Sequence, residues 1–138
     1  MANWVNLSTS RYQAKDLILE SGALAVGITR YPPRWKLAYP IVRLALLAPS
    51  AALLGSLRAG RIGEDVFEFR YSGGLDDLGI ARVRLELETI TAGRDGVLLC
   101  FENVHNNERC HRRVFAKWWR QQTGEGVPEL TPAQQELL

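Results

Sequence analysis

The stretch that decides the fold is Val97-Leu98-Leu99-Cys100-Phe101, a nearly continuous apolar run that follows the turn-forming residues Gly93-Arg94-Asp95-Gly96. A short run that is apolar on both alternating faces is typical of a central strand in a parallel sheet, because helices cover such a strand on both sides. We therefore predict a buried strand over 97–101. Glu102 follows it directly, at the carboxyl end where open α/β sheets bind their ligands.

The clearest helix lies immediately downstream, over 110–122. Its apolar and ring residues recur at helical spacing, and they are His111, Val114, Phe115, Trp118 and Trp119. Gly124 ends the pattern, because glycine accepts the left-handed conformation that terminates many helices. We expect the two tryptophans of this face to anchor the core.

The remainder of the chain alternates between strand and helix patterns. Residues 40–47 fit either a strand or a helix, and we expect residues 9–12 to form the loop after the first strand. We expect strands over 4–8 and 23–29, and helices over 14–21, 50–59 and 80–90. A further helix is expected from about residue 64, with a break or bend at Gly73-Gly74. This alternation predicts an α/β fold with a small open, mostly parallel sheet flanked by helices.

Length and composition restrict the class of protein. A chain of 138 residues fits one domain over 1–138, in which 126–138 form either a flexible or a docking tail. Two cysteines do not make a disulfide framework, and the start Met-Ala-Asn-Trp-Val lacks the pattern of a signal peptide, so we expect a cytoplasmic protein. No apolar run approaches the ~20 residues of a spanning helix, so we expect no membrane partner. The oligomeric state stays open.

Charge is distributed unevenly, although the net charge is only +2. Between Glu108 and Arg120 five basic residues accompany a single acidic one. This local excess predicts an anionic partner, either a small molecule or a nucleic acid, near the C-terminal helix.

Reactive groups gather at the end of the predicted strand over 97–101 and at the start of the predicted helix over 110–122. We predict Glu102, Cys110 and His111 as catalytic residues, because a strand-end carboxylate can act as a base and a helix start favours a thiolate. Arg112 could grip a phosphate or carboxylate through two parallel hydrogen bonds. Two alternatives stay open: His111 could be a packed, hydrogen-bonded histidine, and Cys100 fits a small hydrophobic residue in the strand better than a chemical role.

Further substrate-binding candidates come from two loops. Ser10, Arg11 and Tyr12 follow the first predicted strand and would share the sheet edge with Glu102. Arg34 lies in the proline-stiffened loop 30–35. The alternatives are that Ser10 caps the short helix, and that the second loop is a surface turn.

A metal site fits the sequence poorly. Cys100, His105, Cys110 and His111 are plausible zinc ligands, but their spacing matches none of the usual structural zinc patterns. Adjacent residues such as Cys110 and His111 would also project about a quarter turn apart on a helix. We therefore expect no metal and no other cofactor.

Two motifs resemble the signature of the domain-of-unknown-function 488 family, small bacterial and phage proteins. They are Cys100-x-Glu102 at the end of a strand and Cys110-His111-Arg112 at the start of a helix. Weaker likenesses lie in Thr9-Ser10-Arg11-Tyr12, Pro32-Pro33-Arg34-Trp35 and Leu47-Ala48-Pro49. The resemblance implies an α/β fold and one pocket built from the first loop, Glu102 and the Cys-His-Arg turn, but it implies no reaction. The polar insert over 103–109 is longer than is usual in the family.

Three hypotheses for function follow. The first is a small enzyme that acts on a phosphate-bearing substrate, a nucleotide or a nucleic-acid base. The second is a thiol-based enzyme or redox sensor centred on Cys110. The third is a non-enzymatic module that binds nucleic acid through the basic helix, although its tryptophans share a face with core residues.

Overall fold

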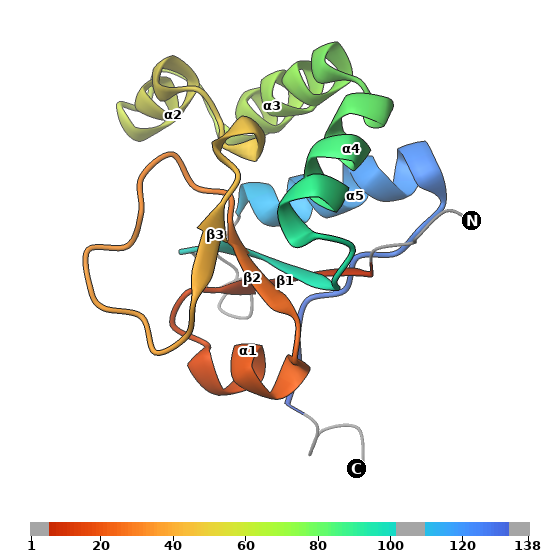
Figure 1. Ribbon diagram of the computed structural model, residues 1–138. Coiled ribbons are helices and arrows are strands. Elements are labelled where there is room, and N and C mark those ends of the chain that lie inside the picture. Colours follow the sequence, from red (N-terminus) through yellow and green to blue (C-terminus); the bar gives the residue numbers. More distant parts are fainter. Residues whose placement is uncertain (1–5, 102–109, 133–138) are drawn as a thin grey trace.

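The sheet at the centre of the molecule has four parallel strands (Figure 1). The computed structural model describes residues 6–101 and 110–132. The strands are β1 (Leu7–Arg11), β2 (Leu24–Gly27), β3 (Ile41–Arg43) and β4 (Gly96–Cys100), in the order β1-β4-β2-β3. The predicted central strand is confirmed, because β4 pairs with both β1 and β2 and each of its residues is buried.

Helices cover both faces of this sheet, as the apolar run of β4 requires (Figure 1). They are α1 (Lys15–Ser21), the 3₁₀ helix η1 (Ala45–Leu47), α2 (Ala51–Arg58), α3 (Glu64–Leu78), α4 (Ile80–Thr91) and α5 (His111–Thr123). Helix α1 lies on one face, and α3, α4 and α5 lie on the other. The predicted fold, a small α/β domain with a parallel sheet, is confirmed.

Successive residues of β4 supply two separate cores, because side chains alternate across a strand. Leu98 and Cys100 point to the face of α3, α4 and α5, where Phe115 of α5 is completely buried. Val97 and Leu99 point to the opposite face, against Ile18 of α1. The larger core also contains Trp118 and Trp119, so their prediction as core anchors is confirmed.

The residues predicted to end or cap helices lie at helix ends in the structure. Gly22 follows α1 with a φ of 67°, and Gly124 follows α5 with a φ of 78°. The hydroxyl of Ser50 accepts a hydrogen bond of 3.1 Å from the amide of Leu53 and so caps α2. The ambiguous segment 40–47 contains both predicted forms, since β3 is followed by η1.

Two predictions of local structure are wrong. Residues 9–11 belong to β1, because Thr9, Ser10 and Arg11 pair in parallel register with Leu98, Leu99 and Cys100. Gly73 and Gly74 lie inside α3, which runs unbroken from Glu64 to Leu78. Each interior glycine costs about 1 kcal/mol relative to alanine, but the helix also buries three large side chains, Phe67, Tyr71 and Leu75. Burial of a large apolar side chain stabilises by about 1.5–3 kcal/mol, so packing outweighs the propensity.

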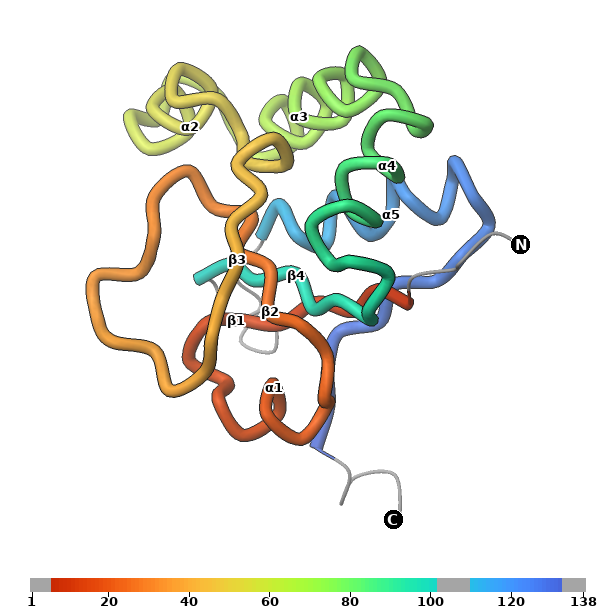
Figure 2. The backbone as a smooth tube through the Cα atoms, viewed as in Figure 1, coloured from red at the N-terminus to blue at the C-terminus, as the bar shows by residue number. Residues whose placement is uncertain are grey.

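The C-terminal segment runs along the outer edge of β1, as the dark blue tube shows (Figure 2). The amide of Thr9 donates to the carbonyl of Pro128 at 2.9 Å, and the amide of Leu130 donates to the carbonyl of Thr9 at 2.8 Å. Residues 128–130 therefore lie against β1, while 133–138 lie outside the described residues.

None of the helices in the described ranges combines the length and the apolar character that crossing a membrane requires.

Candidate functional site

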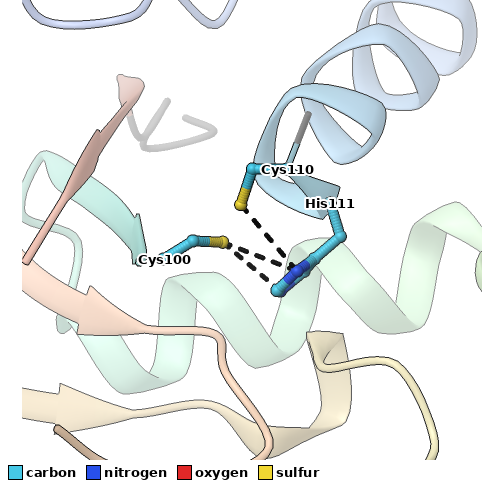
Figure 3. Close-up of side chains that lie close together, drawn as sticks. All are labelled: Cys100, Cys110 and His111. Carbon is cyan, nitrogen blue, oxygen red and sulfur yellow. Dashed lines mark hydrogen bonds between the residues drawn. The ribbon is translucent and has the colours of Figure 1, made fainter. Parts of the chain in front are cut away.

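Two cysteines and a histidine meet where β4 ends and α5 begins (Figure 3). Cys100 is the last residue of β4, Cys110 is the residue before α5, and His111 is the first residue of that helix. The Sγ of Cys100 lies 3.6 Å from Nδ1 of His111, and the Sγ of Cys110 lies 4.0 Å from the same nitrogen. All three side chains are buried, so their polar atoms interact in a low-dielectric environment.

The backbone of Ile28, the residue directly after β2, orients the imidazole. Nε2 of His111 lies 2.7 Å from the carbonyl oxygen of Ile28, and because a carbonyl only accepts, Nε2 carries the proton. The ring of Tyr71 packs edge-on against the imidazole with the ring centres 5.5 Å apart. In the neutral ring Nδ1 therefore carries the lone pair. The Sγ of Cys110 lies 4.0 Å from Nδ1, whereas the Sγ of Cys100 lies beside the imidazole, 3.6 Å from Nδ1 and 3.4 Å from Nε2.

Cys110 and His111 can face one another because Cys110 is not helical. Its φ of −140° and ψ of 143° are those of extended chain. The expectation that these adjacent residues project a quarter turn apart is therefore wrong, because it assumed that both belong to the helix. The ligand atoms of Cys100, Cys110 and His111 all lie within 4.8 Å of one another.

The environment of Cys110 favours its thiolate. Burial by itself raises the pKa of Cys110, but hydrogen bonds with Cys100 and His111 and the charges of His111 and Arg112 outweigh burial and place that pKa well below its ordinary value. The groups that lower this pKa are Cys100, His111 and Arg112.

A cavity of about 450 Å³ opens beside this cluster, at the carboxyl ends of β2 and β4. Its walls come from the loop after β2, from α2 and the segment before it, and from Phe101 and His111. The lining residues are Thr29, Arg30, Tyr31, Pro32, Arg34, Trp35, Pro49, Leu54, Arg58, Phe101 and His111. The cavity lies where an open α/β sheet is expected to bind ligands.

Three of the lining residues carry positive charge, and none of those that the structure describes is acidic. They are Arg30, Arg34 and Arg58, all exposed. Across residues 6–101 and 110–132, the three guanidinium groups have no hydrogen-bond or ion-pair partner. Opposing charge from the described residues therefore does not neutralise this part of the cavity wall.

Aromatic rings form the other part of the wall. Trp35 is 44% exposed and Tyr31 is 57% exposed, so both present ring surface to a ligand. The ring centre of Trp35 lies 5.9 Å from that of Phe101 at a steep angle. The cavity therefore combines positive charge with flat apolar surface.

Buried contacts beneath the cavity hold this wall in place. The Tyr12 and Thr29 hydroxyls share a hydrogen bond of 2.7 Å, and the ring centre of Tyr12 lies 4.8 Å from that of Phe101. Nη2 of Arg43 donates to the carbonyls of Thr29 and Arg30, at 3.1 Å each. Tyr12, predicted as a substrate-binding residue, instead lies behind the cavity wall and supports it.

Arg112 does not line the cavity. Its side chain is fully buried, and it forms two parallel hydrogen bonds with Glu129, from Nε at 3.0 Å and from Nη2 at 2.8 Å. Burial alone lowers the pKa of Arg112, but the hydrogen bonds and charge of Glu129, with the nearby Cys110, outweigh it and raise that pKa. The predicted bidentate grip is present, but it holds a carboxylate of the same chain.

The other predicted residues have different positions. Ser10 is buried within β1, and Arg11 lies half-buried at the end of that strand, outside the cavity. Arg34, predicted to bind substrate, lines the cavity. Glu102 and His105 lie outside the described residues.

Sequence reasoning missed Arg30, Tyr31 and Arg58. The first two follow β2 directly, so the rule that ligands bind at strand ends could have found them. Arg58 lies in the last turn of α2, and only the packing of that helix brings it to the loop after β2.

A family model described as the active DUF488-N3 subclade, DUF488-N3a, matches residues 7–123. No curated protein and no solved structure matches the chain.

Proposed function

This chain belongs to the DUF488 family, and we propose that it is a small enzyme acting on a phosphate-bearing substrate, a nucleotide or a base in a nucleic acid. The observation that carries the proposal is the cavity that three arginines and three aromatic residues line together with His111. Arginines and aromatic rings together are suited to a ligand that carries an anionic group at one end and a flat ring at the other.

The arginines support the anionic end of the substrate. A guanidinium group matches the geometry of phosphate oxygens and donates two parallel hydrogen bonds to them. Arg30 and Arg34 belong to the loop after β2, whereas Arg58 belongs to α2. A phosphate held between them would bridge two elements that are separate in sequence.

The aromatic residues support the ring of the substrate. Base–aromatic stacking contributes about 1–3 kcal/mol per base, and it requires an accessible ring face. Trp35 and Tyr31 meet this requirement, since both are exposed. A simple phosphate ester without a ring would leave this surface unused.

The reacting groups are proposed at the buried end of the cavity, where His111 joins its wall to Cys110. Glu102, outside the described residues, keeps its proposed role as a base or nucleophile. The description of the matched subclade as active favours an enzyme over a binding module. The site is proposed to work in the cytoplasm.

Binding is tested first, by isothermal titration calorimetry with a nucleoside 5′-monophosphate. Arg34→Ala is expected to weaken binding about tenfold, because a hydrogen bond to a charged group contributes about 1.5 kcal/mol. The matched control is Arg82→Ala, which removes an exposed arginine of α4 that does not line the cavity. Equal affinities for the two variants would contradict the proposed site.

Turnover is tested by incubating the protein with nucleotides and short oligonucleotides and analysing the products by mass spectrometry. Glu102→Gln and Cys110→Ala are expected to abolish product formation while circular dichroism shows an intact fold. If turnover survives in both folded variants, the proposed roles are wrong. If both variants unfold, the cluster is structural.

One observation favours a second candidate, a thiol-based enzyme or redox sensor. The sulfur atoms of Cys100 and Cys110 lie within 4.8 Å of each other, close enough for one to attack and the other to resolve. The rate of alkylation of the native protein tests it. A Cys110 that reacts no faster than a free thiol at neutral pH would argue against this candidate.

A further inference from the structure

We propose that Cys100, Cys110 and His111 bind one zinc ion. The proposal concerns this cluster alone and stands whether or not the cavity binds a nucleotide. Thiolate and imidazole groups are the ligands that zinc prefers in proteins, and three of them converge here from two elements.

The separations of these atoms fit tetrahedral coordination. With Zn–S of about 2.3 Å and Zn–N of about 2.0 Å, ligands at a tetrahedral angle lie about 3.5 Å apart for S and N and about 3.8 Å apart for two sulfurs. The observed distances from Nδ1 of His111 are 3.6 Å to Cys100 and 4.0 Å to Cys110. Small side-chain movements would therefore complete the coordination.

The imidazole is already oriented as a ligand. Metal-bound histidines almost always donate their second ring N–H to a carbonyl or carboxylate, which fixes the tautomer and the ring. Here Nε2 donates to the carbonyl of Ile28 at 2.7 Å, which leaves Nδ1 as the nitrogen that can bind the ion. The Sγ of Cys100 lies 3.6 Å from Nδ1 and 3.4 Å from Nε2, and the Sγ of Cys110 lies 4.0 Å from Nδ1. A metal ion between these atoms would bind all three groups at once.

Charge and burial also favour a cation at this point. Cys100 is 0% exposed, Cys110 is 5% exposed and His111 is 8% exposed, so a bare thiolate here would be poorly solvated. Zinc binds both cysteines as thiolates, any thiol proton that is still present passes to solvent, and Zn²⁺ with two thiolates is electrically neutral. Glu64 and Glu68 line a smaller cavity of about 50 Å³ beside Cys110 and His111.

The number of ligands suggests what kind of zinc site this is. Structural zinc sites usually have four protein ligands, whereas catalytic sites have three and keep one position for water or substrate. Since His111 also lines the large cavity, a fourth position on that side would be open to its contents. Such an ion would supply a Lewis acid, and it would leave neither sulfur as a free nucleophile.

The first test is the metal content of the purified protein, with no substrate present. After dialysis against zinc and removal of excess metal, mass spectrometry of the metals is expected to find about one zinc ion per chain. Cys110→Ser should lower the zinc affinity, measured by competition with a chromogenic chelator, by at least about 100-fold, because it removes a direct ligand. Arg34→Ala is the matched control and should keep wild-type affinity.

Because serine at these buried positions could prevent folding, a second measurement uses the unchanged protein. Cobalt added to metal-free wild-type protein is expected to produce thiolate-to-cobalt charge-transfer absorption, which zinc then abolishes. Zinc should also slow alkylation of both cysteines. Folded wild-type protein that takes up no zinc, gives no such absorption, or binds zinc equally well as Cys110→Ser would overturn the proposal.

Discussion

Arg112 and Glu129 form a buried ion pair that ties the start of α5 to the C-terminal segment. The guanidinium side chain is 0% exposed and the carboxylate side chain is 13% exposed, at an Nη2–Oε2 distance of 2.8 Å. Oε1 of Glu129 also accepts hydrogen bonds from Nε of Arg112 at 3.0 Å and from the hydroxyl of Thr9 at 2.7 Å. One carboxylate therefore connects α5, β1 and the segment beside β1.

Glu129→Gln is expected to destabilise the protein by about 3 kcal/mol, because removal of one partner leaves a buried charge without its carboxylate. Urea denaturation measures the change. The control is Glu125→Gln, whose ion pair with Arg84 has side chains 25% and 31% exposed for the arginine and glutamate. That exposed pair should contribute less than about 1 kcal/mol. A similar loss in both variants would contradict the central role of the Arg112–Glu129 pair.

Gly27→Ala is expected to destabilise the protein by about 1–3 kcal/mol through overpacking. A Cβ atom at this position would lie 2.6 Å from the hydroxyl oxygen of Tyr12 and 3.1 Å from Cδ1 of Ile41. The same substitution in a Tyr12→Phe background should cost less, since the hydroxyl is gone. A double-mutant cycle by urea denaturation measures the difference, and additive effects would exclude the clash.

Gly73→Ala is expected to stabilise the protein by about 0.5–1 kcal/mol. Gly73 lies inside α3, and a Cβ added there would meet no atom within 4 Å. Alanine restricts the unfolded chain more than glycine does, so it favours the helix. An increase in the midpoint of urea unfolding with an unchanged slope checks this. A loss of stability would contradict the prediction that helix propensity decides the effect of this substitution.

The stability of the protein is expected to fall as the pH rises from about 10 to 12. Burial, helped by the neighbouring Tyr12, raises the pKa of Tyr39 to about 12, above its ordinary value of 10.0. Between these values the unfolded chain loses this proton while the folded chain retains it, so ionisation favours unfolding by up to about 1.4 kcal/mol per pH unit. Below pH 10 this contribution is fully present.

Urea denaturation at a series of pH values measures this loss. The free energy of unfolding of Tyr39→Phe should decline less steeply with pH than that of the wild type. Part of the decline should remain in this variant, because burial also raises the pKa of Tyr71 and of Tyr12. Parallel curves for the two proteins would show that Tyr39 does not retain its proton in the folded state.

Trp35→Ala is expected to weaken binding of a nucleoside monophosphate about tenfold and to leave the affinity for inorganic phosphate unchanged. Stacking on an aromatic ring contributes about 1–3 kcal/mol per base, and inorganic phosphate has no base to stack. Trp35→Phe keeps a ring and should retain most of the affinity. Calorimetry with both ligands distinguishes these outcomes, and an equal loss for both ligands would remove Trp35 from the proposed base site.

Much of the fold could be predicted because its signals are local. The apolar run over 97–101 requires cover on both faces, and this is what places β4 at the centre of a parallel sheet. Ser50, Gly22 and Gly124 mark helix ends through their own backbone preferences. The prediction failed at Gly73-Gly74, where a weak local preference meets strong tertiary packing.

The candidate site was only partly predictable, because sequence spacing does not determine where each side chain points or which distant residue it contacts. Cys110 and His111 were identified, and so was Arg34, since each lies after a strand or at a helix start. The partner of Arg112 is 17 residues away, at the end of a segment that docks on β1. No local pattern distinguishes an arginine paired in this way from one that binds substrate.

By itself, the sequence determined the central strand, the helices around it and the two motifs that indicate the family, because period, capping and residue type act over a few neighbouring positions. Only the tertiary structure decided which side chains meet. In the folded chain Cys110 lies close to Cys100 and His111, and Arg112 forms an ion pair with Glu129. Arg58 lines the same cavity as Arg30 and Arg34. These contacts join residues that are distant in sequence. They form only when the helices and strands pack together, and the free energy of that packing depends on residues throughout the chain.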